Sequence, residues 1–475
     1  MGDPGTLLVV LVAVLWLGVA WFYTWPAIWF VLLYLPIQGW IQLNVFEDSS
    51  ATVLLYEFQI IGLYLVVAMK ALRSPDRFGP PPAMWYAIPF ALWVLLLVPR
   101  SLAINGTVLT LVGLRTDLLP LPLVWIGYRA FDSRRQLENI GWPLMLQLAF
   151  VGSVGAVQFL SLSSGSGAIF EIPTGYTQAG VIRPPGTFST SAHFGMYILF
   201  SIPFAIGLLG LNVPFWKRMC FVIGLGGATV GLMANTQRAT VVLLSLAIPM
   251  IVLLARRRRA VLHVTIALCA ILGGAVIGNQ LSGEAFQQRV ASITDDLNDT
   301  LVLNPTERWN DAMRDPLWGG GLGIASPGGN RLEPETAMRI ERTVNVIIKT
   351  PESFMPALVY ETGLPGLIFF YLFIAAILYY ELQVLRVLRP TDMGLFAAAI
   401  IGFQIAILIQ SWAYDPLHYP PSRVLFWFWA GALMSLPKLL AQNTGRQVTT
   451  VRRMPMVPQR RLVRPLPAGR RTARV

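Results

Sequence analysis

Long apolar runs separated by short polar segments decide what this chain can fold into. A helix needs about 20 apolar residues to cross the hydrocarbon core of a bilayer. Charged residues make up only 13% of the sequence, against roughly 25% in an average soluble domain, so too little polar sequence remains to cover a soluble core. We therefore expect an all-α polytopic membrane protein with about 12 or 13 transmembrane helices. The thirteen candidate spans are residues 7–23, 25–42, 52–71, 84–99, 108–128, 141–161, 190–211, 219–235, 239–255, 260–279, 354–380, 393–412 and 422–440.

The distribution of positive charge predicts the orientation of these helices. Of the 36 lysines and arginines, 24 lie in alternate loops or near the C-terminus, at residues 70–77, 129–135, 217–218, 256–259, 386–389 and 438–475. The positive-inside rule places such segments in the cytoplasm. The C-terminus is then cytoplasmic, and the polar segment 280–354 is a large periplasmic loop. The net charge of +12 thus reflects membrane topology, and we expect no nucleic-acid partner.

Three regions follow from this organisation. Residues 1–440 form the transmembrane domain, and the large loop, 280–354, is inserted within it. Residues 441–475 form a basic tail that is rich in proline and arginine. We expect this tail to be disordered and to lie near anionic lipid headgroups, which makes membrane lipids an expected partner.

Local signals predict ordered structure inside the large loop. Asn304 to Glu307 is typical of a helix start, with a proline in the first turn and an acid at the positive end of the dipole. The helix would continue from Arg308 to Met313 and end before the glycine run Trp318 to Gly323. This run lacks the Lys-Ser/Thr pair of a phosphate-binding loop, so we interpret it as tight turns and close backbone approach. A second helix is expected from Pro334 to Ile348.

Arginines mark the external ends of the apolar runs. Arg183, Arg238 and Arg423 lie at such ends, and Arg100 and Arg115 lie deeper. An ionisable residue at membrane depth is costly and is a candidate for a functional site. Guanidinium groups bind phosphate oxygens in bidentate geometry, so converging arginines suit a pyrophosphate. The alternative is snorkelling or a structural ion pair, such as Arg115 with Asp117.

Four short motifs occur in a characteristic order. They are Arg183 to Phe188 followed by Ser191 and Ala192; Gln237 to Thr240; Glu307 to Met313 followed by Pro316 to Gly321; and Glu352 to Phe354 followed by Glu361, Gly363 and Gly366. In this order and at these topological positions they resemble the motifs of bacterial O-antigen ligases and Wzy-type polysaccharide polymerases. The resemblance covers roughly residues 183 to 366.

This resemblance implies a glycosyltransferase C-like fold in the bacterial inner membrane. The donor would be an undecaprenyl-pyrophosphate-linked saccharide, and an acceptor hydroxyl would attack its anomeric carbon as the lipid pyrophosphate leaves. Arg183 and Arg238 would neutralise the leaving group, and Arg308 would assist them from the loop. The resemblance also suggests a chain-length regulator protein as a partner. No cofactor or metal is expected, since the arginines supply the compensating charge.

One departure from the family pattern concerns the catalytic base. Ligases of this family begin the last motif with a histidine, whereas this chain has Glu352 there. A carboxylate of suitable pKa removes a proton from a hydroxyl, so Glu352 is the candidate base; the alternative is a solvated carboxylate or an ion pair with Lys349. The short external loop offers Tyr414, Asp415 and His418 as sugar-contacting residues beside Arg423. We expect structural roles for Glu361 and His193.

The missing histidine favours polymerisation of exopolysaccharide or O-antigen repeat units over ligation onto lipid A core. Two other classes remain open: a polysaccharide flippase or transporter, and a scaffold that only binds lipid-linked sugars. A transporter would need a polar path through the bilayer and broken helices in matched halves. No metal site is expected, because Asp295, Asp296 and Asp299 lack the spacing of a calcium loop.

Overall fold

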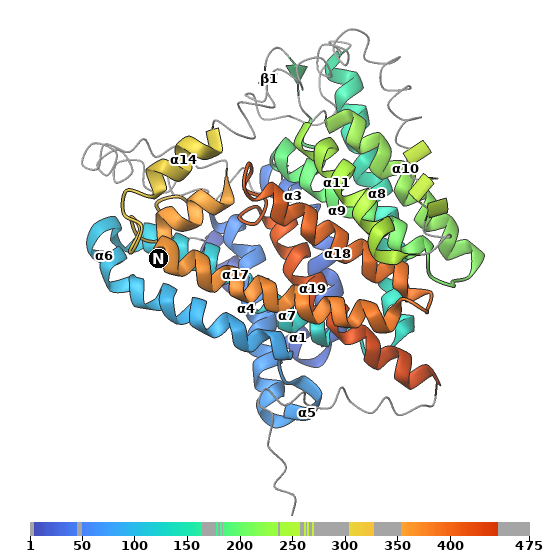
Figure 1. Cartoon of the computed structure of the whole chain (residues 1–475), viewed down its shortest axis with the longest axis horizontal. Coiled ribbons are helices and arrows are strands. Elements are labelled where there is room, and N and C mark those ends of the chain that lie inside the picture. Colours follow the sequence, from blue (N-terminus) through green and yellow to red (C-terminus); the bar gives the residue numbers. More distant parts are fainter. Residues whose placement is uncertain are drawn as a thin grey trace, which may run out of the picture.

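The computed structural model of the chain describes residues 4–44, 50–163, 177–178, 181–182, 184–235, 238–256, 261–262, 264–265, 268–269, 304–326 and 353–444. Within these residues the fold is helical, apart from one two-stranded antiparallel ladder (Figure 1). The ladder joins β1 (Thr177–Gln178) to β2 (Val181–Ile182).

The first half of the chain supplies α1 (Pro4–Phe22), α2 (Thr24–Tyr34), α3 (Gln38–Asn44), α4 (Ser50–Arg73), α5 (Pro75–Phe78), the 3-10 helix η1 (Pro82–Ala87), α6 (Ile88–Asp117), α7 (Leu123–Arg129) and α8 (Arg134–Ser163). The second half supplies α9 (Ser191–Leu209), α10 (Phe215–Asn235), α11 (Arg238–Ala255), α14 (Asn304–Ala312), α17 (Phe354–Leu388), α18 (Met393–Gln410) and α19 (Pro420–Thr444).

Six stretches of helix in the described part of the chain are long and apolar enough to cross a membrane: Pro82–Asp117, Arg134–Ser161, Ser191–Leu209, Phe215–Asn235, Phe354–Leu388 and Met393–Gln410. The predicted helical, membrane-spanning architecture is confirmed at this level. The total of 12 or 13 spans stays a prediction, as do the periplasmic position of the large loop and the glycosyltransferase C-like fold.

Two helices lie at the centre of the bundle. In the apolar segments of α9 and α18, 89% and 83% of the residues are buried inside the protein. Other helices therefore surround both on nearly every side. Aromatic rings of α9 contact both α19 and α18: Phe204 lies 4.6 Å from Trp429, and Phe200 lies 4.9 Å from Phe403. Outer helices instead expose apolar side chains, for example Leu92 and Leu96 on α6, at 58% and 65%. Such a surface suits contact with lipid.

Two of the long helices are broken at a glycine. α6 departs from helical geometry at Gly106 (φ 80°, ψ 176°), and α17 does so at Gly363 (φ 69°, ψ 179°). Only glycine adopts this positive-φ region at little cost. The predicted spans 84–99 and 108–128 were wrong in their bounds, because one broken helix extends to Asp117. A separate short helix, α7, follows the prolines at 120 and 122.

Candidate functional site

Several helix ends that are distant in the sequence gather at one end of the bundle. The backbone N–H of Phe354, at the start of α17, donates to the carbonyl of Tyr414 at 3.0 Å. The ring of His193, at the start of α9, lies 5.2 Å from that of Tyr419, just before α19. Asn235, at the end of α10, donates to the carbonyl of Ser191 at 2.7 Å. The starts of α9, α17 and α19 therefore share one end with the junction of α10 and α11.

The short helix of the large loop packs at this same end. α14 runs from Asn304 to Ala312, which confirms the predicted helix start (Figure 1). The ring of Trp309 lies 5.9 Å from that of Trp412, in the loop between α18 and α19. The Arg308 guanidinium donates a long hydrogen bond of 3.4 Å to the Ser353 hydroxyl. The positive N-terminal ends of several helix dipoles thus face the region beneath α14.

The glycine run after α14 fills the breaks in both broken helices. At the break in α17, the N–H of Gly320 donates to the Tyr360 carbonyl at 2.6 Å, and the N–H of Leu364 donates to the Pro316 carbonyl at 2.7 Å. At the break in α6, Asn105 donates to the Leu322 carbonyl at 3.1 Å. The loop therefore satisfies backbone groups that the break in α17 releases, and it bonds to a side chain beside the break in α6.

The prediction of tight turns and close approach in the glycine run is confirmed. Gly319, Gly321 and Gly323 have φ values of 67°, 97° and 86°. A Cβ added at Gly323 would lie 1.7 Å from the Leu109 carbonyl oxygen of α6. The loop backbone therefore lies directly against the helix.

We expect Gly323→Ala to destabilise the protein by about 3 kcal/mol or more, because it combines strained φ with a backbone clash. Thermal unfolding in detergent measures the loss. Gly226→Ala is the matched control, since a Cβ at this helical glycine meets no atom within 4 Å, and it should leave the unfolding temperature nearly unchanged. Equal stability of the two variants would contradict the described packing of the loop.

A cluster of carboxylates around one histidine lies buried behind this loop. His418 Nδ1 lies 2.7 Å from Asp415 Oδ2, and its Nε2 lies 3.8 Å from Asp117 Oδ1. Glu361 accepts a hydrogen bond of 2.8 Å from the N–H of Ala325. Burial alone lowers the pKa of His418, but Asp415 and Asp117 outweigh it and raise the pKa to about 10. Both carboxylates therefore favour the protonated form of the imidazole.

The cluster borders a small cavity of about 10 Å³, the size of about one water molecule. Its lining includes Asp117, His418 and Phe354. Across the described residues, one oxygen each of Asp117 and Glu361 and the hydroxyl of Ser326 have no hydrogen-bond partner. The structural role expected for Glu361 agrees with its bond to the loop backbone.

A second buried cluster carries excess positive charge. Arg423, on the first turn of α19, is only 6% exposed. Its guanidinium lies within electrostatic range of Arg115, Glu57 and Tyr56. Arg115 forms an ion pair with Glu57 of α4. In the described part of the chain the Arg423 guanidinium has neither a hydrogen bond nor an ion pair of its own, so two guanidinium groups face one carboxylate.

The sequence left open an ion pair of Arg115 with Asp117, and this prediction was wrong. Residues two apart on a helix do not face each other, and α6 turns Arg115 toward Glu57 while Asp117 faces His418. Sequence reasoning also missed Glu57. The signal was present, since Glu57 is an acid inside the apolar run 52–71, just as Arg115 is a base inside another.

The predicted site residues divide into two groups. Arg308, Tyr414, Asp415, His418 and Arg423 lie at the end of the bundle described above. Tyr414 is half-buried, and its carbonyl holds the start of α17. Arg183 and Glu352 lie outside the described residues, as does the Arg238 side chain; the backbone of Arg238 begins α11.

Comparison with protein-family models and with curated protein sequences gives no match. The likeness to O-antigen ligases and polymerases therefore rests on the four motifs. Their described parts lie on α9, α11, α14, the glycine run and α17.

Proposed function

We propose that the protein is a glycosyltransferase that polymerises undecaprenyl-pyrophosphate-linked repeat units of an exopolysaccharide or O-antigen. It would act at the periplasmic face of the bacterial inner membrane. The observation that carries this proposal is the excess positive charge of buried Arg423 and half-buried Arg115, which share the single carboxylate of Glu57 at the end of the bundle where helices begin. A pyrophosphate satisfies both features, because guanidinium groups and helix N-termini bind phosphate oxygens.

In the proposed reaction an acceptor hydroxyl attacks the anomeric carbon of the donor sugar. The bond between that carbon and the pyrophosphate oxygen breaks, and the bonding electrons leave with the pyrophosphate. Arg183, Arg238 and Arg423 stabilise the growing negative charge, with Arg308 assisting. Glu352 takes the proton of the acceptor hydroxyl. Protonated His418 holds Asp415 and Asp117 in place beneath this site.

A transporter is the rival from another class, and the breaks in α6 and α17 are the feature that favours it. In a transporter, broken helices expose their freed backbone groups to substrate near the bilayer centre. Here loop residues already bind at both breaks: Gly320 and Pro316 bond to the backbone of α17, and Leu322 accepts from the Asn105 side chain of α6. The breaks thus anchor the loop, which supports an enzyme with a fixed external site.

The proposed site requires the large loop to be periplasmic. A reporter that is active only in the periplasm should be active when fused near Gly328 and silent when fused near Arg258. The positive-inside rule gives this orientation. The opposite pattern would place the site in the cytoplasm and would exclude a lipid-linked donor at the outer leaflet.

The test of the proposed function is polymer synthesis by purified protein reconstituted with a lipid-linked repeat unit. Arg423→Gln should lower turnover by about 10²-fold or more, as loss of a charge-stabilising donor does in other enzymes. Arg423→Lys should recover part of the activity, because an ammonium lacks the bidentate fork. The measurements are the length ladder of the product and the release of lipid pyrophosphate.

Arg100→Gln is the matched control for this test. Arg100 belongs to the same end of the bundle, but its guanidinium is paired with Asp315 at 2.8 Å and is one-third exposed. Its removal should change turnover less than threefold, since an exposed ion pair contributes about 1 kcal/mol at most. No polymer from the wild-type protein, or normal turnover of Arg423→Gln, would overturn the proposal.

A further inference from the structure

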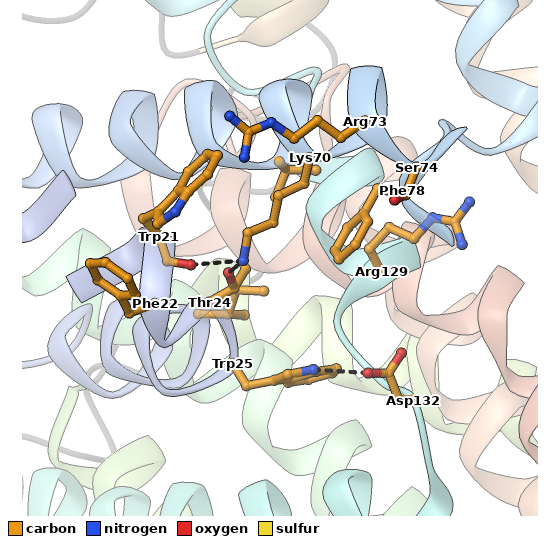
Figure 2. A pocket seen from close by; sticks show the side chains of 12 residues that line it. Trp21, Phe22, Thr24, Trp25, Lys70, Arg73, Ser74, Phe78, Arg129 and Asp132 are labelled. Carbon is orange, nitrogen blue, oxygen red and sulfur yellow. Dashed lines mark hydrogen bonds between the residues drawn. The ribbon is translucent and has the colours of Figure 1, made fainter. Parts of the chain in front are cut away.

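One cavity in the described part of the chain lies away from the candidate site. Its volume is about 440 Å³, and it is formed by the junction of α1 and α2, the ends of α4, α5 and α7, and Asp132 after α7 (Figure 2). α4 connects the two regions: Glu57 faces the candidate site and Lys70 lines the cavity. Thirteen residues of helix separate them, or about 20 Å. The positive-inside rule assigns this end to the cytoplasmic side.

Three cations and one carboxylate line the cavity, namely Lys70, Arg73, Arg129 and Asp132. Lys70 lies at its centre and donates hydrogen bonds to the Trp21 carbonyl at 2.8 Å and the Thr24 hydroxyl at 2.6 Å (Figure 2). The lining is therefore net positive, and one end of α4 presents its cation inside a cavity instead of on an open surface.

Aromatic rings hold these cations in place. The Arg73 guanidinium lies 4.9 Å from the centre of the Trp21 ring, and the Lys70 ammonium lies 5.6 Å from the same ring. Trp25 donates to Asp132 at 3.1 Å, which fixes the single carboxylate at the edge of the cavity (Figure 2). Cation–π contacts of this kind orient a positive charge without neutralising it.

Exposed apolar side chains accompany the cavity. Phe22, which lines it, is 78% exposed, and Tyr23 and Leu72, which adjoin the lining residues Phe22 and Arg73 in the sequence, are 63% and 86% exposed. In a helical membrane protein such side chains suit contact with acyl chains. Basic pockets between membrane helices on the cytoplasmic side are suited to phosphate-bearing lipid headgroups. A soluble anion would leave these apolar side chains uncovered.

The geometry points to a binding site for an anionic phospholipid of the inner leaflet. Its phosphate group lies against Lys70 and Arg73, its glycerol region lies against Trp21 and Trp25, and its acyl chains cover Phe22 and Leu72. This site is independent of the proposed glycosyltransferase activity and lies at the opposite end of α4 from it. The proposed ligand is a lipid with a phosphodiester, one net negative charge and two acyl chains.

The test is native mass spectrometry of the purified full-length chain, titrated with phosphatidylglycerol or with phosphatidylcholine of the same acyl chains. One phosphatidylglycerol should bind at least tenfold more tightly than phosphatidylcholine. Arg73→Gln should weaken this binding by about fivefold, since one basic residue near a lipid surface contributes about 1 kcal/mol. Arg73→Lys should retain most of it.

Arg386→Gln is the matched control, because Arg386 is an exposed arginine at the cytoplasmic end of α17 and lies outside the cavity. It should leave lipid binding within twofold of the wild-type value. Inorganic phosphate is added in competition to distinguish a soluble anion from a lipid. Equal binding of the two lipids, equal losses in Arg73→Gln and Arg386→Gln, or displacement of phosphatidylglycerol by millimolar phosphate would each overturn the proposal.

Discussion

Arg183→Ala and Arg238→Ala should each abolish polymer formation while the variant proteins reach the membrane in wild-type amounts. Arg238 begins α11, at the end of the bundle where helix N-termini gather, and Arg183 precedes α9 in the sequence. Each would bind the pyrophosphate that leaves the donor sugar. A pre-positioned charge of this kind contributes about 10²- to 10³-fold to turnover, and the loss of either arginine leaves too little charge for the leaving group.

Lysine replacements refine this prediction. Arg183→Lys and Arg238→Lys should recover only part of the activity, because an ammonium keeps the charge and loses the bidentate geometry. The measurement is polymer length and lipid pyrophosphate release in reconstituted vesicles, with membrane insertion checked on the same preparation. Wild-type activity in both alanine variants would exclude a shared pyrophosphate site.

Glu352→Gln should lower turnover by about 10²- to 10⁴-fold, the range over which a general base contributes. Donor binding should survive, because the arginines that hold the pyrophosphate are unchanged. Steady-state turnover and donor affinity, measured separately, distinguish these two effects. Normal turnover in Glu352→Gln would make Glu352 a structural charge at the end of the loop, and Asp415 would be the next base to test.

Glu352→His is the informative companion variant. It places the residue of the ligase family at this position, and we expect retained activity with an altered pH profile, since imidazole and carboxylate groups lose their protons at different pH. Asp315→Asn serves as the control, because Asp315 is a half-exposed carboxylate on the same loop that, among the described residues, pairs with Arg100 and the backbone N–H of Trp318. Its turnover should stay near the wild-type value.

Local chemistry explains which parts of the fold the sequence predicted. Asn304 to Glu307 carries its own helix-start signal, so α14 was predicted close to its observed bounds. The glycine run was likewise interpretable, because only glycine tolerates the φ values found there. The apolar runs indicated helices because crossing a bilayer leaves the backbone few alternatives. In each case the deciding residues are neighbours in the sequence.

The breaks in α6 and α17 were not predictable in this way. Gly106 follows an asparagine and Gly363 belongs to one of the four motifs, but the segment that binds at the breaks, Pro316 to Leu322, is a distant part of the chain. The pairing of Arg115 with Glu57 could not be predicted for the same reason, since it depends on how α4 packs beside α6. The candidate residues Asp415, His418 and Arg423 were identified from their position in the short external loop, but their partners were not.

The seating of the glycine run between two helices has a consequence for biogenesis. Asn105 of α6 donates to the Leu322 carbonyl across 217 residues of sequence. At about 5 to 20 residues per second, the ribosome needs roughly 10 to 40 s after Asn105 to synthesise the segment that binds at the break in α6. During that interval the polar groups of α6 sit in a half-built bundle, which is a natural point for an insertase or chaperone to protect them. Slowed translation after α11 would lengthen the wait and should lower the yield of folded protein.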